Sequence, residues 1–148
     1  MKVGMRSLLI AVCVWVVAGV LPAAAQESVV QLKERAFAAR EAEQPKLFLE
    51  VAERQLQAAD NAFSQGQTEA GQAAIEDVAD ACEKAGAAAT GARKHLKSTE
   101  MGIRTLARKL DAMRQTLSFE DQAPLATAIE RMEQVRTDLL NAMFGPRW

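Results

Sequence analysis

The chain has 148 residues, 49% of them hydrophobic, and a formal charge of −1. This near-neutral total excludes the strongly basic composition that is typical of nucleic-acid-binding proteins. The absence of tyrosine and the low aromatic content of 5% disfavour strands, which are rich in aromatic and β-branched residues. We therefore expect an all-α protein.

Residues 1–25 have the order of a cleavable secretory signal peptide. Lys2 and Arg6 precede an apolar run, and Pro22 and three alanines ending at Ala25 follow it. An uncleaved membrane anchor is the alternative, because the run is nearly as long as a membrane span. The proline and the Ala-x-Ala site favour cleavage after Ala25. We expect an exported protein, periplasmic or extracellular, with no transmembrane span after cleavage.

Cleavage leaves residues 26–148, a length typical of one domain. This mature chain has 16 basic and 19 acidic residues, a formal charge of −3, and one cysteine, Cys82. Cys82 falls on an apolar helical face, which favours a buried thiol. Export to an oxidising compartment leaves a second interpretation open, a disulfide between two copies in a homodimer.

Apolar residues recur at spacings of three and four along most of the mature chain. This periodicity predicts helices at about 27–43, 45–64, 68–116 and 119–143. Pro45 separates the first two helices, and a short polar turn follows the second. Ser118 with Asp121 resembles a capping box at the start of the last helix, which Gly145 ends.

The third predicted helix determines the expected architecture. From Ile75 to Leu117 the apolar spacing keeps one phase, whereas a loop usually shifts the phase. We therefore expect one continuous helix over residues 68–116, on the order of 70 Å long. A break near Gly86 to Gly91 is the competing interpretation, because each glycine weakens a helix.

These elements predict an elongated, antiparallel helical bundle of three to four helices. Its central element is the long helix with a coiled-coil-like heptad pattern. The second and last helices fold back along the two halves of the long helix, and the first helix is expected to lie beside the last.

We expect a protein that is not an enzyme and that needs no cofactor or metal. His95 is the only histidine, and no second histidine or cysteine lies at ligand spacing in the mature chain. The covalent haem motif is missing from the sequence. Paired acidic residues fall on polar helix faces without a nucleophile nearby.

Charge is distributed unevenly along the mature chain. Residues 27–83 hold twelve acidic and five basic residues, whereas residues 84–114 hold eight basic and two acidic residues. A favourable interaction with the helix macrodipole is one explanation of this order, since cations favour a helix C-terminus. The other is a docking surface for an anionic partner, either a protein or another component of the cell envelope. The candidate docking residues, on the face opposite the apolar seam, are Lys94, Lys97, Arg104 and Arg108.

The expected function is that of an exported, non-enzymatic interaction or structural protein of a bacterial-type cell envelope. Nucleic acid is not an expected partner, because no aromatic residues lie among the four cations. The alternative is a periplasmic-type helical chaperone or stress-binding protein. Leu117 to Gln122 resembles the Leu-Thr-x-x-Gln element of small periplasmic chaperones, with Ser118 at the threonine position and the glutamine one residue late. That resemblance implies binding of unfolded clients in an apolar concavity.

Overall fold

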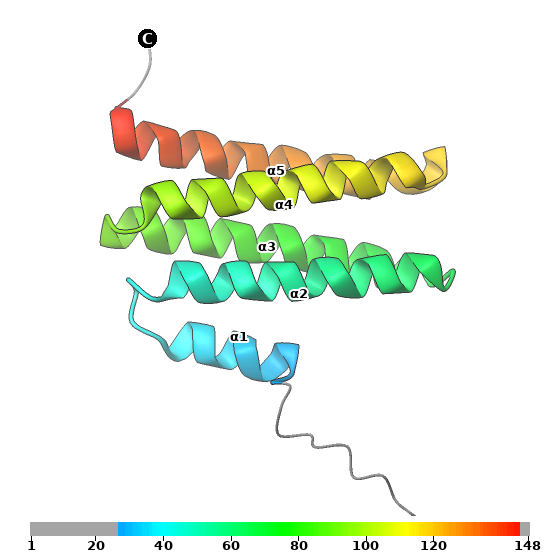
Figure 1. Cartoon of the computed structure of the whole chain (residues 1–148), viewed down its shortest axis with the longest axis horizontal. Coiled ribbons are helices and arrows are strands. Elements are labelled where there is room, and N and C mark those ends of the chain that lie inside the picture. The colour runs from blue at the N-terminus through cyan, green and yellow to red at the C-terminus, as the bar shows by residue number, and fades with distance from the viewer. Residues whose placement is uncertain (1–26, 146–148) are drawn as a thin grey trace, which may run out of the picture.

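The computed structural model describes residues 27–145, and Figure 1 shows that this part of the chain is a bundle of packed helices. The all-α prediction is confirmed, but the number of helices is five rather than three to four. No helix in this range is long and apolar enough to span a bilayer. The predicted signal peptide lies outside the described residues. The helices are α1 (Val29–Ala38), α2 (Gln44–Ser64), α3 (Thr68–Ala92), α4 (Leu96–Thr116) and α5 (Phe119–Phe144).

The prediction of one continuous helix over residues 68–116 is wrong. Between the end of α3 and the start of α4, three residues reverse the direction of the chain. Arg93 and His95 have φ of 51° and 61°, the left-handed conformation that ends helices. The backbone N–H of Lys94 donates to the carbonyl of Ala89 and closes the end of α3. The competing interpretation is right that the helix is broken, but it places the break too early, because α3 continues through Gly86 and Gly91 and ends at Ala92.

The apolar spacing concealed this turn for a geometric reason. Ala92 and Leu96 are four residues apart, which is also the spacing of one helical turn. Ala89 on α3 and Thr99 on α4 belong to the same repeat, and both are buried. Each helix therefore directs the residues of this repeat towards the interior of the bundle. The pattern therefore reports which residues are buried and does not report whether the backbone is continuous.

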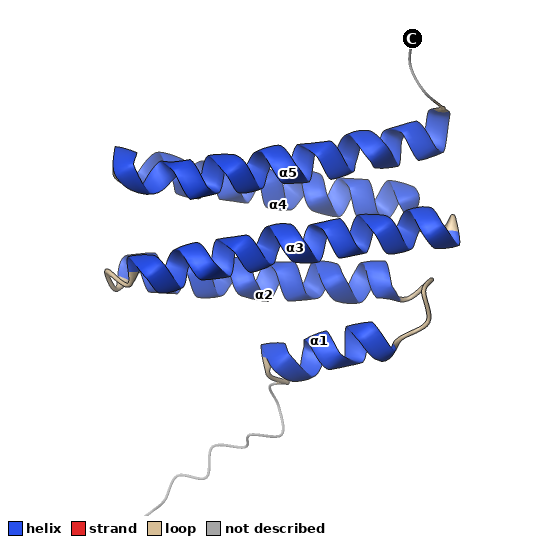
Figure 2. Ribbon diagram, turned by 180° about the vertical axis from the view of Figure 1, so that it is seen from behind, coloured by secondary structure: helices blue, strands red, loops and turns tan. Residues whose placement is uncertain are grey.

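Helices α2 to α5 form an antiparallel four-helix bundle, and α1 packs on its outside. In the bundle α2 contacts α3 and α4, and α5 contacts the same two helices. Figures 1 and 2 show α1 at the outer edge, next to α2. The expectation that the first helix lies beside the last is therefore wrong, since α1 packs against α2 and not against α5.

The starts of the first and last helices differ from the capping pattern expected from sequence. Ser28 and Gln31 form a capping box at α1, each side chain accepting from the other residue's backbone N–H. At α5 the Ser118 hydroxyl donates to the Asp121 carboxylate at 2.9 Å and makes no backbone cap, so the capping box predicted there is absent. α1 ends earlier than expected, because Ala39 is already extended.

One apolar core runs through the bundle, and small residues let the helices approach closely. A Cβ on Gly86 of α3 would lie 2.3 Å from Cγ1 of Val135 on α5, and a Cβ on Gly102 of α4 would lie 2.8 Å from Leu49 on α2. These contacts fix the spacing of two helix pairs. The largest fully buried side chains include Leu32, Ile75, Ile103, Leu110, Leu125, Met132 and Leu139.

Replacing Gly86 with Ala should lower the free energy of unfolding by about 1–2 kcal/mol. The added methyl overlaps Val135, and this strain outweighs the gain of about 1 kcal/mol in helix propensity. Denaturant unfolding measures the change. In a Val135→Ala background the same substitution should no longer destabilise, because the overlap is gone; an unchanged loss there would contradict the packing explanation.

Candidate functional site

The two ends of the bundle differ in charge. The starts of α2 and α4 and the ends of α3 and α5 meet at one end, together with the loop of residues 39–43 (Figure 1). Of the lysines and arginines in residues 27–145, seven make no ion pair, and five of these seven lie at this end. We call these five residues the basic end: Arg40, Lys46, Arg93, Lys94 and Lys97.

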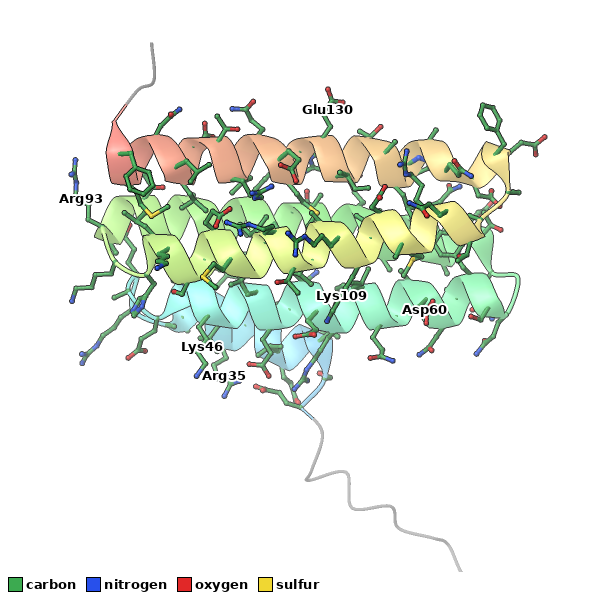
Figure 3. The ribbon with its side chains drawn as sticks, turned by 45° about the horizontal axis from the view of Figure 1, so that its top comes forward. Arg35, Lys46, Asp60, Arg93, Lys109 and Glu130 are labelled. Atoms are coloured by element: carbon green, nitrogen blue, oxygen red, sulfur yellow. The ribbon has the colours of Figure 1, made fainter. Side chains whose placement is uncertain are left out.

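Two separate chain segments supply the basic end. Arg40 and Lys46 come from the loop before α2 and from the first turn of α2, whereas the other three cations belong to the α3–α4 turn and the start of α4. All five side chains are exposed, and Figure 3 shows Arg93 projecting from this end and Lys46 pointing away from the ribbon. Glu41 and Glu43 lie in the same loop, but no acidic residue occurs between Glu83 and Glu100.

The opposite end is acidic. Asp60 near the end of α2, Glu69 at the start of α3 and Glu120 at the start of α5 are exposed and make no ion pair within the described chain. Figure 3 shows Asp60 towards this end, far from Arg93. The uneven charge noticed in the sequence therefore becomes a polarity from one end of the bundle to the other.

The helix macrodipole does not explain Lys46 and Lys97 of the basic end, although it favours Arg93 and Lys94 at the C-terminus of α3. Lys46 lies in the first turn of α2 and Lys97 in the first turn of α4, and neither first turn contains an acidic residue. A cation at a helix N-terminus is unfavourable by about 0.3–1 kcal/mol. The sequence-based macrodipole explanation placed Lys97 in the second half of one long helix, which does not exist.

The four predicted docking residues divide into two pairs. Lys94 and Lys97 are exposed at the basic end. Arg104 and Arg108 lie farther along α4, where they line a shallow groove of about 490 Å³ together with Arg136 of α5. Arg104 is occupied by an ion pair, so the four cations do not form one free surface.

Arg104 is held by the only buried acidic residue among residues 27–145, Glu100, which is 2% exposed. Arg104 donates to both carboxylate oxygens of Glu100, at 3.1 and 2.7 Å, and Arg136 of α5 donates at 2.9 Å. Burial alone would raise the pKa of Glu100, but the hydrogen bonds from the two arginines outweigh it and lower the pKa below 4.5. This cluster joins α4 to α5 and has a structural role.

A second arginine cluster joins α3 to α5. Arg131 donates to Glu83 at 2.8 and 2.9 Å, to Asp80 at 2.5 Å and to Glu76 at 2.8 Å. Hydrogen bonds to Glu83 and Asp80 raise the pKa of Arg131. One arginine thus offsets part of the charge of three carboxylates on the acidic face of α3.

Two hollows lie at the basic end and share His95 and Ser98. The larger, a cleft of about 890 Å³ between α1, α2 and α4, is lined mainly by apolar residues such as Pro45, Leu47 and Leu49. The smaller, about 530 Å³, lies between the start of α4 and the end of α5. Its lining combines cations with methionines: Arg93, Lys97, Met101 and Met143.

Cys82 is shielded from solvent in the core of the bundle. Cys82 is fully buried on α3, and burial, with a smaller contribution from the charge of Glu83, raises the pKa of its thiol to about 12. A disulfide between two copies would require this part of the core to open, and it stays a prediction. Within residues 27–145, no group of three or more His, Cys, Asp or Glu is placed to hold a metal ion.

Comparisons with known proteins found no matching family model, no matching curated protein and no matching solved structure. Arg40 and Lys46 were missed in the sequence because they lie far from Lys94 along the chain. A sign that could have pointed to Lys46, though not to Arg40, is its position in the first turn of a helix that lacks the acidic residues usual there.

Replacing Glu100 with Gln should lower the free energy of unfolding by about 1–3 kcal/mol, because two arginines lose their shared carboxylate. The loss stays below that of a fully buried pair, since Arg104 is 41% exposed and solvent screens its charge. The matched control is Glu50→Gln, which breaks an exposed i,i+4 pair with Arg54. That control should change stability by less than about 0.5 kcal/mol. Equal losses in denaturant unfolding would contradict the role assigned to Glu100.

The same carboxylate makes stability depend on pH. Because the pKa of Glu100 is lower in the folded chain than its ordinary value of 4.5, its contribution is complete above that pH. It is lost as the pH falls through the folded pKa. The stability difference between wild type and Glu100→Gln should therefore shrink below pH 4.5, and a constant difference in acid would contradict the shift.

The thiol of Cys82 should resist alkylation in the folded protein at pH 8 and react after unfolding in guanidinium chloride. Both its burial and its raised pKa suppress the reactive thiolate. Thr90→Cys provides the matched control, because Thr90 lies exposed on the same helix. Mass spectrometry counts the labels. Equal labelling rates at the two positions would show that the core around Cys82 opens readily.

Proposed function

We propose that this chain is a non-enzymatic binding module of the cell envelope that docks on an anionic partner through its basic end. The observation that carries the proposal is the placement of Lys46 and Lys97. Both lie in first helical turns, where a cation weakens the helix, and both lack an ion-pair partner within the described chain. Residues that break a local stability rule without compensation are typical of functional sites.

The surroundings of these two lysines support the same proposal. Arg40, Arg93 and Lys94 lie at the same end and are also unpaired within residues 27–145, so positive potential is concentrated there. A gathered set of cations raises the association rate with an anionic partner and orients its approach. The acidic residues of the opposite end add to this orientation, because the same partner repels them.

The geometry gives less support to the alternative, a chaperone that holds unfolded clients. The concavity that fits such a role best is the cleft between α1, α2 and α4. Its volume of about 890 Å³ lies within the range of small-molecule sites, roughly 300–1,000 Å³, and is small for a length of unfolded chain. The chaperone remains a prediction without a specific contact to favour it.

Replacing Lys94 and Lys97 with Gln should reduce retention on a phosphate-bearing cation-exchange resin at low salt by about tenfold or more. The substitutions remove two free cations of the basic end. Retention measured at several salt concentrations reports the effect. The retention of wild type should itself fall as the salt concentration rises, because salt screens the interaction. Thermal unfolding should show a variant about as stable as wild type, because losing Lys97 relieves the start of α4 whereas losing Lys94 removes a favourable cation at the end of α3.

The matched control is the double variant Lys84→Gln with Arg108→Gln. It removes the same net charge from two cations that are also unpaired in residues 27–145 but lie away from the basic end. This control should bind the resin nearly as well as wild type. Equal losses in the two double variants would mean that net charge alone governs binding, and the proposed docking end would be rejected.

A further inference from the structure

We infer that the anionic partner of the basic end is the headgroup layer of a lipid bilayer, with Phe144 inserted beside the headgroups. This inference rests on the proposed function and names the partner of the same site. Phe144 is the last residue of α5 and is 69% exposed, so its ring lies at the end of the bundle that carries the cations. A large exposed aromatic residue among free cations is typical of proteins that bind at a membrane interface.

The smaller hollow at this end shows that cations and apolar side chains share one surface. It brings Arg93 and Lys97 together with Met101 and Met143, and Met143 precedes Phe144. Met101 is 50% exposed, although Met is a residue that proteins usually bury. A lipid surface offers phosphates to the cations and acyl chains to the methionines and the ring, within a depth of about 5–10 Å.

The shape of the site favours a bilayer over a soluble polyanion or an acidic protein. The cations come from two chain segments at the end of the bundle, so a flat surface laid across that end meets both. Long lysine and arginine side chains reach phosphates from the rim while their stems lie along apolar surface. A soluble polyanion would gain nothing from the exposed Phe144 and Met101.

A second copy of the chain is the other occupant that the charges allow. Its acidic end, with Asp60, Glu69 and Glu120, would face the basic end in a head-to-tail contact. Such a contact does not close on itself and would produce filaments. Light scattering across a range of protein concentrations distinguishes this case, because lipid docking leaves a monomer in solution and head-to-tail contacts do not.

Vesicle sedimentation tests the inference, using the chain from residue 26 onwards, which contains all five packed helices. The chain should sediment with vesicles of equal parts phosphatidylcholine and phosphatidylglycerol at low salt and should stay in solution with phosphatidylcholine alone. Phe144→Ser should weaken vesicle binding about tenfold. The same variant should bind the phosphate-bearing resin as wild type does, because the resin has no apolar layer.

Phe119→Ser is the matched control, since Phe119 is 89% exposed at the acidic end, at the other terminus of the same helix. It should bind vesicles as wild type does. Resin binding without vesicle binding would overturn the lipid inference and leave the proposed function standing. If the chain bound neither the resin nor the vesicles, both the proposed function and the lipid inference would be overturned. Equal binding to neutral vesicles, equal behaviour of the two serine variants, or concentration-dependent filaments would each overturn the lipid inference alone.

Discussion

The reversal of the chain at Arg93 to His95 is the constraint on which the rest of this structure depends. Two left-handed residues and one backbone hydrogen bond to Ala89 convert what would be a single rod into the antiparallel pair α3 and α4. The same turn brings α4 beside α2, and its antiparallel partner α5 beside α3. It also places Lys94 at the end of the bundle, whereas the apolar spacing of the sequence predicted that Lys94 lies in the middle of a helix.

The reversal of the chain between α3 and α4 also determines which charged side chains form ion pairs. On a continuous rod the acidic and basic halves would be separated along one axis and exposed to solvent. In the bundle the acids of α3 face α5, where Arg131 binds three of them, and Glu100 is buried between two arginines. Ion pairs within and between helices therefore use cations along the length of the bundle and leave the unpaired ones mainly at one end. A chain whose residues 27–145 are acidic overall can thus carry a locally basic surface.

The sequence predicted the features that depend on local spacing and failed on those that depend on contacts between distant segments. The α2 and α5 bounds follow from apolar periodicity and from breakers such as Pro45 and Gly145. The α3–α4 turn was missed because its length preserves the four-residue spacing from Ala92 to Leu96. Two of the four predicted docking residues lie at the basic end. Arg104 does not, because it lies about two turns farther along α4, where the buried Glu100 binds it.

The difference in charge between the two ends of the bundle would give a docked molecule a defined orientation. An anionic surface that attracts the basic end repels Asp60, Glu69 and Glu120, so the helix axes would stand away from the surface rather than lie along it. The opposite end, with the exposed ring of Phe119, would then project from the surface. In the proposed docking, the bundle would present two chemically different ends, one to the anionic surface and one to the solvent beyond it.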